Sequence, residues 1–293
     1  MTASLTSLAS SAAVSTINNR GNLGRVVKDT FSGDSLKGAA ISGVVSGVTA
    51  GYIDSKFKGA DAAFSKTAGF DLTTLKGVGG FGLRAGAIGV ASGAIKTAVD
   101  GGSLSDNLLN ALVSQASTVV AATAFNAIGN VASKNLADAT GRSDAAGIAL
   151  WSEGGAGRVA LHALTGGAVS AATGGDFVAG AMAAGVNEAM ARALEDVYLK
   201  QPDVRDSFVQ IIGMAAAGMV NGDMEKGLWI AQMADRYNRQ AHPAETVQIK
   251  QQAQALAEAQ GITPRHRGSL PPKLNCAWPV RWPTTPTVNG NRS

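Results

Sequence analysis

Glycines that recur about one helical turn apart are the feature that most constrains the fold of this chain. They stand four residues apart in the uncharged stretch 38–53, and three or four residues apart in residues 82–93. On a helix this spacing places the glycines on one face, where a second helix can approach backbone to backbone. The two stripes consist of Gly43, Gly47, Gly51, Gly82, Gly86, Gly89 and Gly93.

The glycine stripes have two interpretations, and the residues alone leave both open. In one, weakly apolar helices enter or cross a membrane and the stripes contact lipid or other helices there. In the other, the stripes are tight packing surfaces within a soluble helical bundle. Arg84 interrupts the second stripe, which argues against a conventional transmembrane protein.

The amino-acid composition favours helices over strands. Hydrophobic residues make up 45% of the 293 residues but aromatic residues only 5%, and 37 residues are glycine. Sustained alternation of apolar and polar residues, which is the pattern of a strand, is rare. A glycine within a helix costs about 1 kcal/mol relative to alanine, so such helices need close partners or a membrane. We therefore predict an all-α fold of Gly/Ala-rich helices with small-residue interfaces.

Three regions of different character follow one another along the chain. Residues 1–35 form a polar N-terminal segment, and residues 36–260 form a helical region with a soft boundary near 134–157, where the sequence is charged and glycine-rich. Residues 261–293 form an irregular tail that holds six of the eight prolines, and we expect it to be disordered. Within the helical region, residues 107–133 carry no charge and are long enough to cross a bilayer, which takes roughly 20 residues. Their Asn, Gln, Ser and Thr content makes them a poor membrane span.

Start and stop signals divide the helical region into separate helices. Asp34 and Ser35 are candidate caps for a helix that starts near Leu36, and Gly101-Gly102 followed by Ser103 indicates a break and a new start. Further turns are expected at 174–176 and 221–223. Helices are expected at 107–133, 159–172, 177–194, from 202 to 220, at 224–240 and at 243–260.

Composition and motifs argue against several kinds of chemistry. The net charge of +4 is too mild for a nucleic-acid footprint, and Cys276 is the single cysteine, so neither a disulfide nor a cysteine zinc site can form within the chain. No pair of the three histidines has metal-ligand spacing, and neither a phosphate-binding loop nor a nucleophile elbow occurs. We predict no enzyme activity, no cofactor, no nucleic-acid partner and no small-molecule substrate.

Three short motifs have a functional interpretation and a structural one. Residues 77–82 fit G-x-G-x-x-G, but the preceding residues 71–76 are too polar for the buried strand that a dinucleotide site requires, so a chance match is favoured. His162 lies in an apolar helical stretch, which favours a histidine with its hydrogen bonds satisfied in the core or at an interface. Asn187-Glu188 could be a buried catalytic pair, although a hydrogen bond at the helix surface or between helices is favoured.

Several stretches together resemble one known domain. It is the hemagglutinin-related domain of unknown function found near the C-terminal end of large two-partner-secreted exoproteins, a group that includes filamentous hemagglutinins and contact-dependent growth inhibition toxins. The resemblance covers about residues 10–250, and the order and spacing of the motifs make it fairly specific. The matching residues are 15–24, 36–38, 51–52, 102–106, 124–126, 161–164, 174–176, 187–188, 237–240 and 242–243.

The resemblance implies a place in a larger secreted protein. Such a segment lies after the adhesive β-helix and before a variable C-terminal toxin, is exported through an outer-membrane transporter, and is delivered toward a neighbouring cell. The expected function is therefore non-catalytic, namely to present or translocate the toxin at the target-cell envelope or membrane. Two alternatives remain: a passive structural module of an adhesin, and a nuclease-like toxin enzyme. We expect the secretion signal to lie in the parent protein, because residues 1–20 lack the pattern of a signal peptide.

Overall fold

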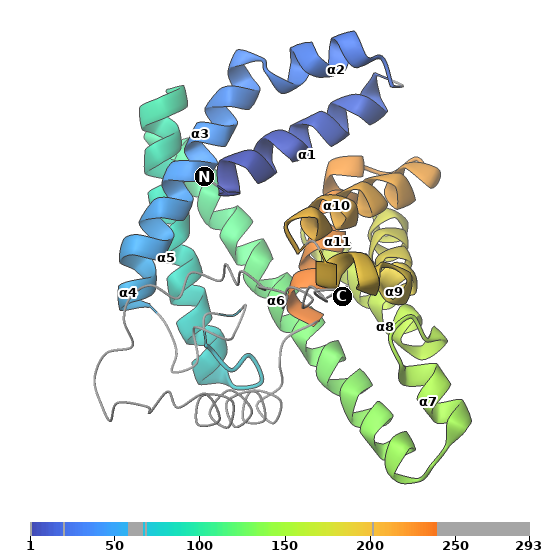
Figure 1. Ribbon diagram of the computed structural model, residues 1–293. Coiled ribbons are helices and arrows are strands. Elements are labelled where there is room, and N and C mark those ends of the chain that lie inside the picture. The colour runs from blue at the N-terminus through green and yellow to red at the C-terminus, as the bar shows by residue number, and fades with distance from the viewer. Residues whose placement is uncertain (1, 20, 58–66, 68, 201, 239–293) are drawn as a thin grey trace, which may run out of the picture. The chain divides into compact units, whose positions relative to one another are not determined.

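Every regular element in the described part of the chain is a helix. The computed structural model describes residues 2–19, 21–57, 67, 69–200 and 202–238. No strand occurs among these residues, which confirms the predicted all-α fold. The elements are α1 (Thr2–Asn18), α2 (Leu23–Thr30), α3 (Gly33–Val48), the π-helical turn η1 (Thr49–Ile53), α4 (Asp54–Lys56), α5 (Leu75–Asp100), α6 (Leu104–Gly141), α7 (Ala145–Trp151), α8 (Ala156–Ala172), α9 (Phe177–Lys200), α10 (Pro202–Met219) and α11 (Met224–Asn238) (Figure 1).

The chain divides into two compact units. The first comprises residues 1–246 and contains all the helices above, whereas the second comprises residues 247–293 and lies outside the described residues. The helix expected at 243–260 and the proline-rich tail expected at 261–293 therefore also lie outside them.

The N-terminal segment is more helical than its polar composition indicated. It contains α1 and α2, and α3 begins at Gly33 rather than near Leu36, because Ser32 is extended and its side chain accepts a hydrogen bond from the backbone N–H of Ser35. Short helices rich in serine are marginal alone. Here α1 packs against α2, α3 and α10, which supplies tertiary stabilisation that local propensity does not reveal.

Glycine and serine set the hairpin between α5 and α6 as the sequence indicated. Gly101 and Gly102 have φ of +85° and +86°, a left-handed conformation that glycine adopts without strain. Ser103 then caps α6 by accepting a hydrogen bond from the backbone N–H of Asp106. α6 runs past the expected end at residue 133 to Gly141, because Lys134 and Asp138 are exposed to solvent and need not end the helix.

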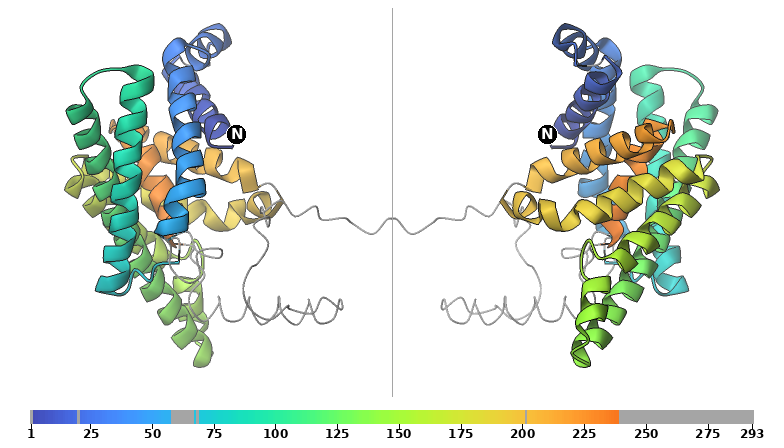
Figure 2. Two further views of the ribbon diagram at one scale, coloured as in Figure 1. Left: turned by 90° about the vertical axis from the view of Figure 1, so that its left-hand side faces the viewer. Right: turned by 90° about the vertical axis from the view of Figure 1, so that its right-hand side faces the viewer.

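Two groups of helices lie within the first unit. We call residues 33–56, α5 and residues 104–120 of α6 the apolar layer, and α8, α9, α10 and α11 the C-terminal bundle. The helix 33–56, which is α3, η1 and α4 in one continuous run, packs along α5 (Figure 2). The first part of α6 packs on α5, and α6 also contacts α7, α8 and α11, so one long helix belongs to both groups.

The main hydrophobic core lies where α6 meets the C-terminal bundle. Phe125 of α6 is fully buried there, and Phe81 of α5 meets Tyr237 of α11 edge to face with ring centroids 6.0 Å apart. Many of the core side chains are alanines, so the helices must approach closely to exclude water. The core consists of Leu72, Phe81, Ala121, Ala122, Phe125, Val169, Ala183, Ala184, Ile230, Met233, Ala234 and Tyr237.

Candidate functional site

The apolar layer is long and apolar enough for membrane contact. The helices that contribute to it, 33–56, 75–100 and 104–141, have 24, 26 and 38 residues and contain windows of mean hydropathy 1.2, 1.3 and 1.4. Only 11%, 22% and 17% of the residues in those windows are buried within the protein. By length and composition all three could cross a bilayer. Large apolar side chains on their open faces include Val44, Leu83, Val90, Leu109, Val113 and Val120.

The predicted glycine stripes divide into close contacts and open positions. A Cβ atom at Gly93 would lie 2.7 Å from Cα of Leu108, and one at Gly89 would lie 3.0 Å from a methyl carbon of Leu112, so both glycines let α6 approach α5. Gly43 faces the side chain of Ser4 on α1. The other four glycines have nothing within 4 Å of a Cβ: Gly47, Gly51, Gly82 and Gly86.

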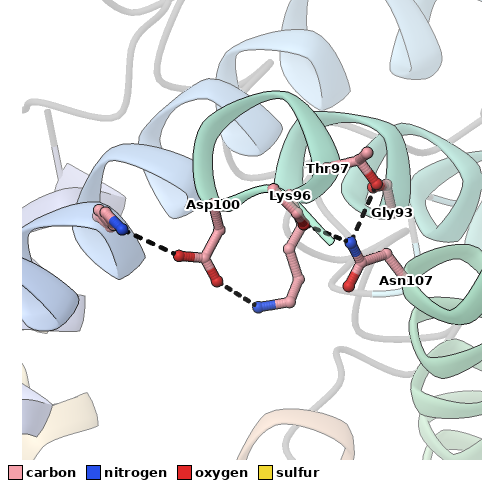
Figure 3. A network of polar contacts seen from close by, with 7 residues as sticks. Gly93, Lys96, Thr97, Asp100 and Asn107 are labelled. Carbon is pink, nitrogen blue, oxygen red and sulfur yellow. Dashed lines mark hydrogen bonds and ion pairs between the residues drawn. The ribbon is translucent and has the colours of Figure 1, made fainter. Parts of the chain in front are cut away.

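A polar network closes the end of the α5–α6 hairpin (Figure 3). Buried Asn107 donates hydrogen bonds to Oγ1 of Thr97 and to the carbonyl oxygen of Gly101, both at 3.0 Å. Asp100 accepts from Nζ of Lys96 at 3.1 Å and from Nζ of Lys37, on α3, at 3.4 Å. The network therefore fastens both α6 and α3 to the end of α5.

Arg84, which interrupts the second glycine stripe, is paired. Its Nε lies 2.8 Å from Oδ1 of Asp54 at the other end of the helix 33–56, and its side chain is 17% exposed. Positive and negative charges on two neighbouring apolar helices thus compensate each other, as ionisable groups in membrane proteins commonly do. The sequence alone gave no partner for Arg84.

Three elements of the first unit, namely α8, α11 and the loop before α8, bring polar groups to the buried carboxylate of Glu188 on α9. Oε1 lies 3.0 Å from Nε of Arg158 and accepts from the backbone N–H of Gly154 at 3.2 Å. Oε2 accepts from Nδ2 of Asn238 at 3.2 Å and lies 3.4 Å from Nε2 of His162. The side chains of Glu188 and His162 are 2% and 1% exposed. This arrangement ties α8, α9, α11 and the loop before α8 together.

The Glu188 cluster accords with the structural interpretation of two sequence motifs. His162 is a core histidine whose ring lies 5.9 Å from that of Phe125, and Glu188 bonds between helices rather than at the surface. Arg158 and Asn238 were not predicted from the sequence, although Asn238 stands in one of the motifs that carry the resemblance. A carboxylate with donors on both oxygens is suited to holding helices together.

The C-terminal bundle is built on glycine pairs that the sequence analysis did not single out. A Cβ at Gly180 of α9 would lie 2.5 Å from the carbonyl oxygen of Gly166 on α8. A Cβ at Gly213 of α10 would likewise lie 2.5 Å from the carbonyl oxygen of Gly227 on α11. Each pair marks a crossing where the two backbones touch. The pairs lie on different helices, so a repeat within one helix cannot reveal them.

Lys226 joins the start of α11 to the end of α8. Its Nζ donates to the carbonyl oxygen of Thr173 at 2.9 Å and lies 4.6 Å from the ring centroid of Trp229. Partial burial lowers the pKa of Lys226 below its usual value. The ammonium group of Lys226 therefore stabilises the C-terminus of α8, where backbone carbonyls lack partners within the helix.

A cavity of about 630 Å³ lies among α1, the α2–α3 junction and α11. Asp29 at its wall accepts from Asn19 at 2.7 Å and Ser15 at 2.9 Å, and these hydrogen bonds hold the pKa of Asp29 below its usual value. The carboxylate of Asp29 thus stabilises the contact of α2 with the end of α1. The lining residues are Ser7, Ser11, Val14, Ser15, Asp29, Ser32, Ser35, Glu225 and Leu228.

The G-x-G-x-x-G match lies inside a helix. Gly77 and Gly82 stand in the first turns of α5, which Thr74 caps, and the residues before it form a turn rather than a strand. Gly77 and Gly80 make room for the backbone of Asp71 and the ring of Phe70. This packing accounts for the first glycine of the motif and for Gly80, which stands at one of its variable positions. Among the described residues, no group of three or more His, Cys, Asp or Glu side chains is placed to hold a metal ion.

Comparison with known proteins identifies a family for this chain. The model of a family described as "Possible hemagglutinin (DUF637)" matches residues 1–184. No curated protein and no solved structure matches the chain. The matched region contains the whole apolar layer, α7, α8 and the start of α9, and it stops shortly before Glu188.

Proposed function

Because the chain belongs to the possible hemagglutinin (DUF637) family, we propose that it is a non-catalytic segment of a secreted bacterial exoprotein that helps a C-terminal toxin reach a target cell. The family is of hemagglutinin type, which suits a secreted or surface protein. The contact-dependent growth inhibition type of parent, and export through an outer-membrane transporter, are parts of this proposal. In it, the apolar layer associates with the membrane of the target cell while the C-terminal bundle stays outside.

Three long apolar helices that the fold leaves uncovered carry the proposal. Leu83, Val90 and Leu109 are 68%, 52% and 61% exposed, although water-exposed apolar surface of this extent is uncommon unless something covers it. A bilayer would remove these side chains from water without new protein contacts. The pairing of Arg84 with Asp54 supports the same function, because it lowers the cost of placing either charge near lipid.

The buried carboxylate supports a role without catalysis. Glu188 is held by donors from the loop before α8, from α8 and from α11. A general base needs access to a substrate proton, whereas this carboxylate lies 2% exposed among fixed partners. We therefore assign it to holding the bundle together while the apolar layer changes its surroundings.

Vesicle flotation of the full chain tests the proposal. Vesicles of phosphatidylethanolamine and phosphatidylglycerol should carry the protein to the top of a density gradient. Leu83→Gln and Leu109→Gln should each lower the partition coefficient about tenfold, because each removes about 1.5 kcal/mol or more of apolar burial. Leu164→Gln on α8 is the matched control, since Leu164 is 62% exposed but lies outside the apolar layer. A soluble protein indifferent to these vesicles would refute the proposal.

A passive adhesin module is the second candidate function, and the family description favours it. Such a module would bind cell surfaces through its folded exterior and would not need the apolar layer to meet lipid. Binding of the full chain to intact cells, unchanged by Leu83→Gln and accompanied by no vesicle binding, would support this function over the first.

A further inference from the structure

We infer that the apolar layer enters the bilayer as one three-helix unit fitted to a membrane thinner than average. The inference rests on the proposed membrane function and deepens it by naming the inserting unit and the class of bilayer. It comes from the two ion pairs between the helix 33–56 and α5, from the uncharged residues between those pairs, and from the packing of α6 on α5.

The two ion pairs show that the helix 33–56 and α5 run antiparallel in register. Lys37, near the start of the first helix, meets Asp100 at the end of α5, whereas Asp54, near the end of the first helix, meets Arg84. Lys37 and Asp54 are 17 positions apart and Arg84 and Asp100 are 16 positions apart. At 1.5 Å per residue these spans are about 26 Å and about 24 Å, so the pairs lie at matching heights.

Between the two ion pairs the helix 33–56 carries no charge, and α5 carries only Lys96. Residues 38–53 and 85–95 contain no Asp, Glu, Lys or Arg. Lys96 stands one turn before Asp100 and reaches it at 3.1 Å, so its ammonium lies at the end of the hairpin. α2, which carries Arg25, Lys28 and Asp29, leads into the helix 33–56 at this same end of the layer.

α6 supplies a third helix, uncharged from residue 107, across most of the same height. Gly93 faces Leu108 and Gly89 faces Leu112, so α6 runs antiparallel to α5 and reaches the height of Arg84 near residue 117. Residues 107–133 carry no charge. The helix 33–56 and α5 therefore bound a zone about 24–26 Å thick with ion pairs at both of its edges, and α6 crosses this zone with one acidic residue, Asp106, about 8 Å inside the edge at Asp100.

This thickness points to a lipid bilayer and to a particular class of bilayer. The hydrocarbon core of an average bilayer is roughly 30 Å thick, and the bacterial outer membrane is thinner than average. An apolar protein partner or a second copy of the chain would not require charged groups to stand at two matching depths on neighbouring helices. A bilayer imposes that requirement on all helices that cross it.

Phosphatidylcholine vesicles of graded thickness test the inference on the full chain. Dilauroyl, dioleoyl and dierucoyl lipids form bilayers of increasing thickness, and hydrophobic mismatch is costly for each ångström. We expect the partition coefficient measured by flotation to fall about tenfold or more from the dilauroyl to the dierucoyl vesicles. Equal binding to all three would overturn the inference yet leave the proposed membrane function standing, whereas no binding to any vesicle would remove both.

Exchanging the charges of one ion pair tests whether the helices enter together. Asp54→Arg places two guanidinium groups side by side and should lower the partition into dilauroyl vesicles about tenfold, whereas Asp54→Arg combined with Arg84→Asp should restore it. Circular dichroism and a urea midpoint like the parent's should accompany the double variant. A folded double variant that fails to regain binding would overturn the inference, as would a lipid-independent dimer that covers the apolar layer.

Discussion

The apolar layer and the C-terminal bundle are built from similar residues but use them differently. Both contain glycines spaced for close helix packing. In the bundle, Gly166 faces Gly180 and Gly213 faces Gly227, so each of these glycines lies where two helix backbones cross in contact. In the apolar layer, Gly82 and Gly86 have nothing within 4 Å of a Cβ. The same small-residue pattern thus forms a closely packed interior in one region and leaves an exposed apolar surface in the other.

The two regions also differ in where they place their charged groups. The bundle buries the Glu188 carboxylate among partners from several helices, whereas the apolar layer places its ion pairs at its ends with partly exposed side chains. A buried carboxylate fixes one arrangement of its helices, because every displaced partner leaves an unsatisfied group. End-placed pairs tolerate a change of surroundings. The bundle therefore should be rigid where the layer is adaptable.

Glu188→Gln should cause a larger loss of stability than any single substitution in the apolar layer. Removing the charge leaves the guanidinium of Arg158, which is 10% exposed, without its counter-charge. Breaking a buried ion pair from one side costs about 3–5 kcal/mol. Urea unfolding followed by circular dichroism measures this loss. Glu225→Gln, on an exposed residue of α11, is the matched control and should change the free energy of unfolding by less than about 0.5 kcal/mol. Equal effects of the two variants would show that the carboxylate of Glu188 does not hold the bundle together.

Gly180→Ala tests the backbone crossing of α8 and α9. The new methyl group would meet Ser170 and the carbonyl oxygen of Gly166, and overpacking of this kind costs about 1–3 kcal/mol. Alanine regains about 1 kcal/mol of helix propensity, so the net loss should be up to about 2 kcal/mol in urea unfolding. A variant more stable than the parent would show that the two helices can move apart at this crossing.

These glycines also show how far the sequence could predict the fold. Local signals sufficed where the cause is local: Gly101-Gly102 ends α5, Ser103 caps α6, and the all-α class follows from composition and missing alternation. The partner of each glycine is set by contacts between helices distant in sequence. A four-residue repeat therefore found Gly89 and Gly93 but not the pair of Gly166 with Gly180.

The Glu188 cluster, like the glycine contacts, could be predicted from the sequence only in part. His162 stands in an apolar stretch and Glu188 on a small-residue helix, so a buried, satisfied role could be expected for each. Their meeting could not, because Arg158, Glu188 and Asn238 come from three helices whose packing fixes the cluster. The ion pair of Arg84 with Asp54 was hidden for the same reason, and Arg84 therefore looked like an interruption.

Gly86→Ala should change the free energy of unfolding in the opposite direction to Gly180→Ala. Because nothing lies within 4 Å of a Cβ at this position in α5, the added methyl group should gain helix propensity and restrict the unfolded chain without a clash. The free energy of unfolding in urea should rise by about 0.5–1 kcal/mol. A destabilised variant would mean that position 86 is packed against something, and the apolar layer would then resemble the bundle more closely.

Tyr237→Phe probes the junction of the two regions at alkaline pH. Burial raises the pKa of Tyr237, on α11, above its usual 10.0, while its ring packs edge to face on Phe81 of α5. A raised folded-state pKa gives stability that is fully present below pH 10 and is lost as the pH rises through the folded value. At pH 10 the unfolded tyrosine is half ionised and the folded one is less so, which makes the loss at this pH at most about 0.4 kcal/mol, or RT ln 2.

The parent should therefore lose stability more steeply than Tyr237→Phe as the pH rises above 10. Taking the difference between the two proteins cancels the titration of lysines, which both share. Tyr52→Phe removes a hydroxyl from an exposed ring of the apolar layer and should follow the parent instead. If Tyr237→Phe also followed the parent, α5 and α11 would be separating before the tyrosine ionises. The junction would then be the first contact to open, and the apolar layer could leave the bundle without unfolding it.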